Sequence, residues 1–504
     1  MKESDNIIFY NTSDLMETTQ IRQRATAEYL SQQLAERFAS EIIRVVSVQI
    51  NDSGHYRTLL SNIQGLPAYS AVELEHSTGR HSERIIVWSP LAWNDRFIGT
   101  GGGGTSTGGK GTVMRPRNTT RGMTLPKAVL NGFTAATTDG GNRTREWALD
   151  PQTRQLDWDR IENWRSRSTH FMTLIGKAVA EILHQRPVQY AYFHGGSGGG
   201  RQAMVEAQDH PQDYNGIWAT CPAINWSKFV LGGLWPIAVM NSAGRILSRH
   251  KIKYFTQAAQ DSAGGAASYY RQSAKVIFDP HSVVGHMTKD GSITAVDADI
   301  MQQIWDGPRR TDGSFLWYGF RPGVHFWNVI IPIGAFYYSL IGFKPKPFLI
   351  STYYARWITG DPKQTFNNIT KDEFVRLFDR SATELAGVAA DNADLRPFAS
   401  AGGKLIIDHG IDDPLIPVDG TIDYYDRLCA AMGGRPAIGQ FCRLYITPGD
   451  VHGNCSGHGP GLTERDGMIA LIGWVEQGIA PQALRVVQVG RKGETICERT
   501  QEPY

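Results

Sequence analysis

A serine enclosed by glycines is the residue of this sequence with the clearest chemical potential. Ser197 stands in GGSGG (195–199), after the apolar run VQYAYF (188–193) and before the helical pattern RQAMVEAQDH (201–210). A Gly-x-Ser-x-Gly turn between a strand and a helix holds the serine on a strained corner, where its hydroxyl is presented as a nucleophile. Small residues are needed around it because the strand and the helix pass close together. The alternative, a flexible glycine loop with an incidental serine, does not explain the patterns on both sides.

The acid that such a serine needs has three candidates. A serine hydroxyl is a weak nucleophile unless a base takes its proton, and in this setting the chain order is serine, acid, histidine. The segment DHGIDDPLIP (408–417) offers Asp408, Asp412 and Asp413. Asp413 lies in the loop after the strand-like part, directly before a proline, where an orienting carboxylate belongs. The ordinary alternative for each aspartate is to form a turn or cap a helix.

The histidine expected to act as the base is His452. It lies in the glycine-rich segment TPGDVHGNCSGHGPG (447–461), after the strand-like run FCRLYI (441–446). A glycine-rich loop lets the ring reach back over the edge of a sheet. His458 is the rival in the same loop, whereas His194 and His409 border the other motifs at positions that suit structural roles.

Backbone amides are expected to stabilise the negative oxygen that forms when the serine attacks. One donor is the N–H of Gly198, the residue after the nucleophile, at the start of the following helix. The second belongs to a loop after an early strand. The run of glycines at 101–104 follows such a strand, so Gly102 and Gly103 are the expected donors there.

The same glycine-rich stretch nearly matches a phosphate-binding loop. The segment GTSTGGK (104–110) satisfies G-x-x-x-x-G-K. Gly111 then stands where the motif needs Ser or Thr for magnesium, and no helical pattern follows. Nucleotide binding is therefore the weaker interpretation, and no cofactor and no metal are expected.

The elements that must position these residues alternate between strand and helix patterns. Together they predict an α/β fold with two sheet-forming parts, at 1–225 and 401–504, and an inserted lid-like domain at 226–400, where the alternation weakens and aromatic residues gather. The strand-like runs are 42–50, 84–90, 132–141, 188–193, 403–410 and 441–449, and the helical patterns are 18–40, 169–185, 201–210 and 469–478.

Composition excludes several classes of protein. The 504 residues carry a formal net charge of only +2, so no global basic field points to nucleic acid as a partner. Five cysteines without C-x-x-C spacing argue against a disulfide scaffold or a zinc site. The N-terminus lacks the pattern of a secretory signal, so a cytoplasmic location is expected. The apolar stretch 326–343 is interrupted by Asn, Pro and Gly, so stable membrane insertion is not expected; the oligomeric state stays open.

Several separated motifs, in the same order, resemble the tannase and feruloyl esterase family, which includes aromatic polyester monoester hydrolases. The resemblance implies an α/β-hydrolase core with a large lid, and hydrolysis of esters, commonly of hydroxylated aromatic acids. Carried over by position, it makes Ser197 the nucleophile, Asp413 the acid and His452 the base. The motifs are LPAYSAV (66–72), WNDRFIGTGGGG (93–104), ATTDGGN (136–142), the whole of 192–226, IWDGPR (304–309), HGIDDPLIP (409–417) and RLYITPGDVH (443–452).

The sequence also departs from that family's pattern. The resemblance implies a disulfide between cysteines beside the nucleophile and the histidine, but Gly196 and Gly453 occupy those positions, and Ser70 replaces another usual cysteine. Cys455 lies close by and is expected to be a small buried residue. The family lid commonly binds calcium, yet residues 257–280 lack the acidic spacing, so no calcium is expected there.

The expected activity is cleavage of a carboxylic ester or lactone of an aromatic or polyketide-like small molecule. Aromatic residues of the lid could supply a stacking surface, although packing within the lid is the ordinary role for each of them. Acyl transfer or cyclisation with the same triad, a non-catalytic binding protein on the same fold, and a lipase-like enzyme that uses the apolar stretch 326–343 remain alternatives. The candidate aromatic residues are Trp317, Tyr318, Phe326, Trp327, Phe336 and Tyr337.

Overall fold

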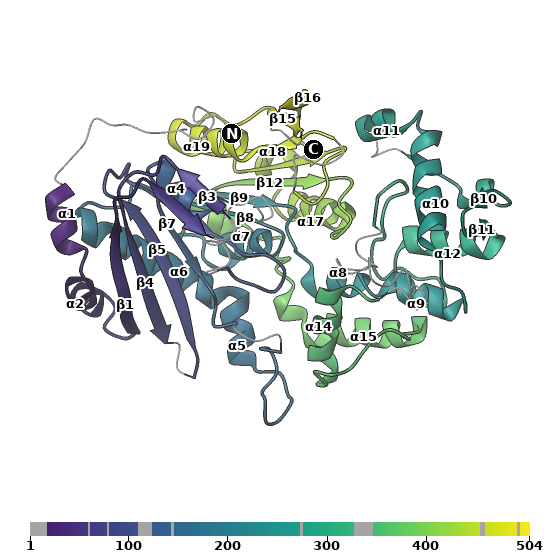
Figure 1. Ribbon diagram of the computed structural model, residues 1–504, viewed down its shortest axis with the longest axis horizontal. Helices are drawn as coiled ribbons and strands as arrows, with labels where there is room; N and C mark the ends of the chain where they lie inside the picture. Colours follow the sequence, from purple (N-terminus) through teal and green to yellow (C-terminus); the bar gives the residue numbers. More distant parts are fainter. Residues whose placement is uncertain are drawn as a thin grey trace.

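Six parallel strands form the part of the central sheet that bears on function. The computed structural model describes residues 18–58, 61–77, 80–108, 123–142, 146–272, 276–326, 346–453, 459–490 and 494–504. Within these residues a nine-stranded sheet has the order β1-β4-β5-β7-β6-β8-β9-β12-β13 (Figure 1). The strands from β7 to β13 are parallel, whereas β1, β4 and β5 extend the sheet with antiparallel pairs. The bounds are β1 Ile42–Asn51, β4 Tyr69–Ser77, β5 Ser82–Pro90, β6 Arg96–Thr100, β7 Thr134–Thr138, β8 Tyr190–Gly196, β9 Gly216–Thr220, β12 Lys404–Gly410 and β13 Cys442–Thr447.

The strand order reverses between β6 and β8, the two strands that carry the glycine motifs. The chain leaves β6, passes to its neighbour β7 on one side and then crosses to β8 on the other side. In open α/β sheets, ligands bind outside the carboxyl ends of the strands at such a switch point. The residues that follow β6 and β8 therefore meet where a binding site is expected.

Helices cover both faces of the sheet, as parallel strands that are buried on both sides require. One face packs on apolar residues of α2, α6, α7 and α17, and the other on α4 and α19. Apart from its first residue, β8 is buried along its whole length, which explains why its sequence is apolar without alternation. The helices are α2 Ala27–Arg37, α4 Leu125–Leu130, α6 Ser168–His184, α7 Gly198–Asp209, α17 Val418–Ala431 and α19 Glu464–Gln477.

The chain between β9 and β12 builds a mainly helical region beside the sheet. In Figure 1 its teal and green helices α9, α10 and α12 and the hairpin β10–β11 lie to the right of the strands. Most of its buried apolar residues belong to one cluster, separate from the two that cover the sheet. The elements are α8 Trp226–Gly232, α9 Trp235–Ser242, α10 Arg249–Ser262, α11 Ala266–Gln272, η4 Pro280–Val283, β10 Met287–Thr288, β11 Gly291–Ser292, α12 Ala295–Asp306, α14 Leu349–Thr359, α15 Lys371–Glu384, η6 Ala386–Val388 and α16 Arg396–Ser400.

Most elements expected from the sequence are present. The helix expected over 18–40 is two helices, because Thr26 accepts a hydrogen bond from the Tyr29 N–H and begins a new helix. Three strands of the central sheet, β4, β6 and β9, were not expected. For β6 and β9 the reason is that runs of five residues without alternation give little signal. The remaining elements are α1 Thr18–Arg24, β2 His55–Thr58, β3 Ser61–Gln64, α5 Trp158–Glu162, η2 Asn163–Arg167, α18 Arg435–Ile438, β14 Gly461–Leu462, β15 Leu484–Val489 and β16 Thr495–Gln501.

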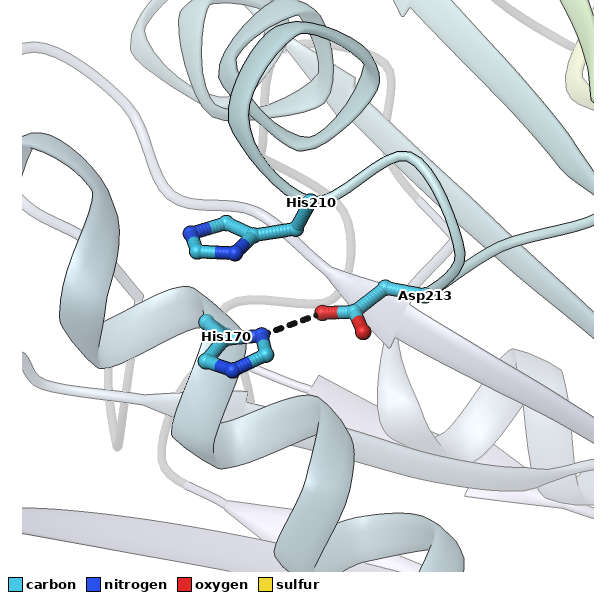
Figure 2. Close-up of side chains that lie close together, drawn as sticks. All are labelled: His170, His210 and Asp213. Carbon is cyan, nitrogen blue, oxygen red and sulfur yellow. Dashed lines mark hydrogen bonds and ion pairs between the residues drawn. The ribbon is translucent and has the colours of Figure 1, made fainter. Parts of the chain in front are cut away.

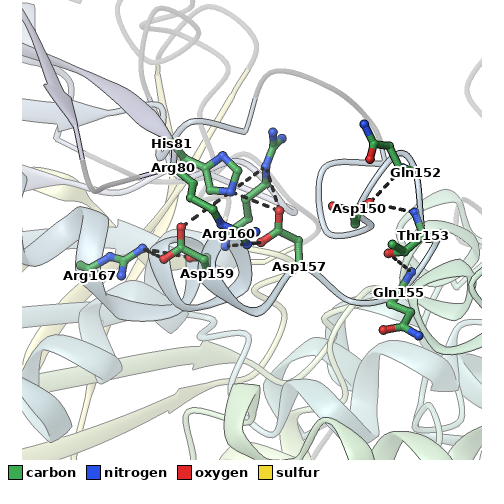
Figure 3. Close-up of polar contacts among 10 residues, drawn as sticks. All are labelled: Arg80, His81, Asp150, Gln152, Thr153, Gln155, Asp157, Asp159, Arg160 and Arg167. Carbon is green, nitrogen blue, oxygen red and sulfur yellow. Dashed lines mark hydrogen bonds and ion pairs between the residues drawn. The ribbon is translucent and has the colours of Figure 1, made fainter.

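An ion-pair network anchors the segment that leads into α6 (Figure 3). Asp157, at the start of α5, contacts Arg80 at 3.1 Å and His81 at 3.1 Å, and both of these residues lie just before β5. The neighbouring Asp159 pairs with Arg167 at 2.7 Å. These contacts fix the start of α5 against the β4–β5 turn and thereby place η2 and α6 against the sheet.

Candidate active site

Ser197 occupies a strained turn between β8 and α7, as the sequence predicts. Its backbone angles are φ 60° and ψ −120°, a conformation that non-glycine residues rarely adopt. Hydrogen bonds on both sides hold it in place: the Ser197 N–H donates to the Thr220 carbonyl at 3.0 Å, and the Ser197 carbonyl accepts from the Ala223 N–H at 3.0 Å. The loop after β9 therefore fixes the strained residue.

The glycines around Ser197 are required by close packing. A Cβ atom at Gly198 would lie 2.4 Å from the Gly104 carbonyl oxygen, and one at Gly199 would lie 2.7 Å from the Gly102 carbonyl oxygen. At Gly200 the Cβ would lie 2.7 Å from the Thr220 carbonyl oxygen. The first turn of α7 thus packs directly on the backbone of the loop after β6 and on the end of β9.

Asp413 is the candidate acid that contacts His452, the expected base. Its Oδ2 lies 2.7 Å from His452 Nδ1 and 3.0 Å from His409 Nε2, while its Oδ1 accepts from the N–H groups of Leu415 at 2.8 Å and Ile416 at 3.1 Å. Burial by itself would raise the pKa of Asp413, but the positive field of His452 and the hydrogen bonds from both histidines hold it well below its usual range. The carboxylate therefore stays ionised inside the protein.

The other two aspartates of this segment serve the scaffold. Asp408, on β12, accepts hydrogen bonds from Trp218 Nε1 at 2.5 Å and Thr220 Oγ1 at 2.6 Å. Asp412 accepts the Gly449 N–H at 2.7 Å. Asp408 thus ties neighbouring strands together and Asp412 shapes the loop after β13, which leaves Asp413 as the carboxylate that faces His452.

His452 is largely enclosed, with 11% of its side chain exposed. Burial lowers its pKa, but the charge of Asp413 and the contact with the Cys221 thiol outweigh that effect and raise the pKa well above the usual value for histidine. Its rival His458 lies outside the described residues. His194 is structural: its Nδ1 accepts the Met123 N–H at 3.1 Å, and its ring stacks on Trp218 at 3.9 Å.

Ser197, Asp413 and His452 all follow the carboxyl ends of parallel strands, β8, β12 and β13, at one edge of the sheet. Cys221, which follows β9, lies next to Thr220, whose carbonyl accepts the Ser197 N–H, and its Sγ lies within 4.8 Å of a ring nitrogen of His452. Ser197 and His452 are both in the described part of the chain, and no hydrogen bond joins them there. Such catalytic contacts are often long in the free enzyme and tighten when substrate binds.

The loop after β6 is held to α7 by Gln202, whose importance the sequence did not reveal. Gln202 Oε1 accepts the Gly102 N–H at 2.9 Å, and its Nε2 donates to the Thr107 carbonyl at 3.2 Å. The Gly102 N–H, expected to face the reacting oxygen, is thus engaged by a side chain. This corrects the expected donor set, because the N–H groups of Gly103 and Gly198 remain as the candidates.

Three of the six candidate lid aromatics lie in the described residues. Phe326 is fully buried and stacks on Phe320 at 5.3 Å, and Trp317 is buried against Gly420 of α17, so both pack within the lid and at its junction with the core. Tyr318 instead lines a narrow cleft together with Leu415 and Pro417, which follow the acid. Trp327, Phe336 and Tyr337 lie outside the described residues.

Two groups of side chains have the chemistry of metal ligands, with one candidate ligand atom per residue within 4.8 Å of the others. One is Cys221 with Asp413 and His452. The other is His170, His210 and Asp213, between α6 and the end of α7 (Figure 2). There the two imidazole rings are nearly parallel, with centroids 4.0 Å apart. An ion in the plane of one ring would lie outside the plane of the other, so this stack suits packing better than coordination.

The four cysteines in the described residues are free, and Gly196 and Gly453 are described as well. No disulfide is therefore present next to Ser197 and His452 within that part of the chain. Cys455 lies outside it. Of the helices that the structure describes, none has the length and apolar character that a membrane span requires; most of the apolar stretch 326–343 falls outside the described residues.

Comparison with known sequences gives consistent relatives. A family model described as tannase and feruloyl esterase matches residues 75–328 and 349–502. A probable feruloyl esterase of Arthroderma benhamiae is 33% identical over 449 residues, which cover 84% of this chain and 79% of that protein. The mono(2-hydroxyethyl) terephthalate hydrolase of Piscinibacter sakaiensis is 27% identical over 471 residues, covering 78% and 73%.

Solved structures show the same fold at lower identity. Feruloyl esterase B from Aspergillus oryzae superposes with a TM-score of 0.76 at 18% identity, covering 94% of this chain and 96% of the other. The tannin acyl hydrolase from Aspergillus niger gives a TM-score of 0.77, also at 18% identity, covering 98% and 92%. These neighbours identify the architecture as the α/β-hydrolase fold.

Proposed function

Because this chain belongs to the tannase and feruloyl esterase family and is a carboxylic ester hydrolase, we propose that it works through an acyl-enzyme on Ser197, with His452 as the base and Asp413 as the acid. The observation that carries the proposal is the 2.7 Å contact between Asp413 Oδ2 and His452 Nδ1. It lies at the sheet edge where the strained turn presents Ser197, and that order of residues along the chain is the one this fold uses.

The first half of the reaction forms the acyl-enzyme. Ser197 Oγ attacks the ester carbonyl carbon while His452 Nε2 takes the hydroxyl proton, and Asp413 stabilises the imidazolium that results. The N–H groups of Gly198 and Gly103 donate to the negative oxygen, at the N-terminus of α7. Collapse of the intermediate breaks the bond to the alcohol, which leaves with the proton from His452.

Water completes the cycle. His452 takes a proton from a water molecule, the water oxygen attacks the acyl carbon, and the acid product leaves as Ser197 recovers its proton. If another alcohol attacked in place of water, the same residues would carry out acyl transfer. The product formed by the wild type therefore decides between hydrolysis and transfer.

We assign the substrate to esters of aromatic acids, with residues 226–400 as the lid that covers them. Two sequence relatives are named for such esters, a probable feruloyl esterase and a mono(2-hydroxyethyl) terephthalate hydrolase. Tyr318 lies close to the loop that holds Asp413, because it lines a narrow gap with Leu415 and Pro417 of that loop.

The test is a panel of cinnamoyl, benzoyl and aliphatic esters and lactones, assayed with the wild type and Ser197→Ala. The wild type should prefer aromatic acyl groups, and the variant should lose at least about 10⁴-fold in kcat on the best substrate, since the nucleophile is gone. Ser262→Ala, on the lid helix α10, is the matched control and should keep wild-type turnover. Full turnover by Ser197→Ala would exclude the proposed nucleophile, and a preference for aliphatic esters would exclude the proposed substrate class.

A further inference from the structure

Cys221 is a buried thiol at the junction of the three catalytic loops. It is the first residue after β9, has no exposed surface, and adopts a positive φ of 36°. Its N–H donates to the Asp408 carbonyl at 2.6 Å. Its neighbours Thr220 and Ala223 hydrogen-bond both backbone groups of Ser197. The backbone around Cys221 is therefore fixed relative to the proposed nucleophile.

The thiol of Cys221 also faces the proposed base. Its Sγ belongs to the group of ligand atoms within 4.8 Å that includes Asp413 and His452. Asp413 Oδ2 hydrogen-bonds His452 Nδ1 at 2.7 Å, so Nε2 is the ring nitrogen that this carboxylate leaves open. Nε2 is also the nitrogen that has to take the proton of Ser197.

Within the described residues, the side-chain hydrogen bond of the His452 ring goes to Asp413. The following Gly453 N–H closes a tight turn on the Val451 carbonyl at 2.7 Å. An imidazole ring that is hydrogen-bonded at one nitrogen only can still change its orientation about that contact. A second contact at a fixed point of the scaffold would remove that freedom.

We propose that Cys221 is a positioning residue for the reaction: its thiol holds the His452 ring beside Ser197 and accepts the N–H of the imidazolium that forms when the serine gives up its proton. Sulfur is a weak hydrogen-bond acceptor, so the contact restrains the ring without competing strongly with substrate. This inference rests on the proposed triad, and it assigns a role to a residue with no reactive function of its own.

The electrostatic surroundings fit this role. Burial raises the pKa of the Cys221 thiol above its ordinary value, even though His452 lowers it in part, so the sulfur stays protonated at neutral pH. The charged groups around the ring are Asp413 beside it and Asp408 behind Cys221, while His409 reaches the ring only through Asp413. The thiol contact adds to the effect of Asp413 in raising the pKa of His452.

The experiment compares kcat, KM and the pH dependence of kcat/KM for the wild type, Cys221→Ala and Cys221→Ser. The alanine variant should lose about tenfold in kcat with KM within about twofold of the wild type, because a misdirected base slows the chemical step and not binding. The acidic limb of its kcat/KM profile should move to lower pH, because the variant lacks one contact that favours the charged form of the His452 ring. The serine variant, whose hydroxyl can still hydrogen-bond, should recover most of both changes.

Cys442→Ala is the matched control, because Cys442 is an equally buried free cysteine, on strand β13 of the same sheet. It should keep the wild-type kcat and pH profile. Equal kcat and an unmoved acidic limb in Cys221→Ala would overturn the inference, as would a loss that Cys221→Ser does not recover. The titration of His452 followed by NMR in Cys221→Ala, Cys221→Ser and the wild type, all in the Ser197→Ala background, gives a readout without turnover. A lower pKa of His452 in the alanine variant that the serine variant restores supports the role, and an unshifted titration in the alanine variant overturns it.

Ser197→Ala separates the two proposals. An active Ser197→Ala would refute the triad itself, whatever the cysteine variants do. An inactive Ser197→Ala together with an unaffected Cys221→Ala would leave the proposed function standing and remove only the role of the thiol.

Discussion

At the scale of single residues, His452, the proposed base, lies in an environment that favours its charged form. Asp413 lies against His452 Nδ1 and is itself held ionised by His409 and by two backbone N–H groups. His452 must be neutral to accept the proton of Ser197. The arrangement that orients the ring therefore also delays its deprotonation as the pH rises.

The pH dependence of catalysis should reflect this. Protonated His452 cannot act as a base, and its pKa is raised above the usual value. The kcat/KM of the wild type should therefore rise with pH through an apparent pKa above about 6.5, the usual value for histidine. Initial rates with a neutral aromatic ester from pH 5 to 9 measure this limb. A limb centred below 6 would contradict the assignment of His452 as the titrating base.

Part of the candidate site could be predicted from the sequence. The turn that holds Ser197 has a local signature, Gly-x-Ser-x-Gly, and the structure places this residue in a strained turn between β8 and α7. The position of Asp413 in a loop after a strand singled it out among three aspartates, and its contact with His452 agrees with that choice. The position of Cys221 near His452 could not be predicted, since a contact between side chains from different loops leaves no pattern in spacing.

At the scale of elements, the loop after β6 and the first turn of α7 form one unit joined by Gln202. Its side chain accepts the Gly102 N–H and donates to the Thr107 carbonyl, so one residue holds the loop at two points. The next amide, Gly103, is the one that we propose as the donor for the reacting oxygen. The placement of that amide should depend on Gln202 although Gln202 itself need not touch substrate.

Gln202→Leu should therefore lower kcat by about 10- to 100-fold with a smaller effect on KM, because a displaced amide costs stabilisation of the transition state. Gln208→Leu, on the same helix but bonded to the Ala390 carbonyl, is the control and should keep the wild-type kcat. Steady-state kinetics on one aromatic ester measure both variants. Unchanged kcat in Gln202→Leu would mean that the loop keeps its shape without the Gln202 contacts.

Elements were easier to predict where they are long. The strands 42–50 and 84–90 and the helices after Ser168 and Ser197 appear where periodicity placed them. β9 was missed because its five residues, GIWAT, begin with glycine and are buried without alternation. The pattern over 18–40 correctly predicted helix, but it did not predict the break at Thr26. There the side chain caps a new helix, which competes with continuation of the first one.

At the scale of the whole molecule, buried histidines should make stability depend on pH. His184, at the end of α6, bonds Ser89 through Nε2 at 2.9 Å and stacks on Trp93 at 4.7 Å. Burial lowers its pKa to about 3, with smaller contributions from Arg186 and Arg24. The folded protein therefore keeps this ring neutral at a pH where the unfolded chain would protonate it.

Stability should fall as the pH drops below about 6.5, because only the unfolded state then gains a proton at this position. Between pH 6.5 and 5 the contribution is about 2 kcal/mol. The free energy of unfolding, measured with denaturant at several pH values, should fall less between about pH 6.5 and 5 for His184→Gln than for the wild type. This difference does not depend on how stable the variant is at neutral pH. His286→Gln, at an exposed position, is the control and should show the same dependence of the free energy of unfolding on pH as the wild type. If His184→Gln also showed the wild-type dependence, the prediction would be contradicted.

The tight seating of α7 on the loop after β6 has a practical consequence for laboratory evolution. At Gly195, Gly198, Gly199 and Gly200, any side chain would collide with the backbone of a neighbouring segment. Libraries that randomise this stretch should consist almost entirely of inactive clones. Diversity is better directed at the proposed lid, for example at Tyr318, which lies outside this tightly packed stretch. Close packing fixes the turn that holds Ser197, so we expect that selection can change the preferred ester more readily than the reaction itself.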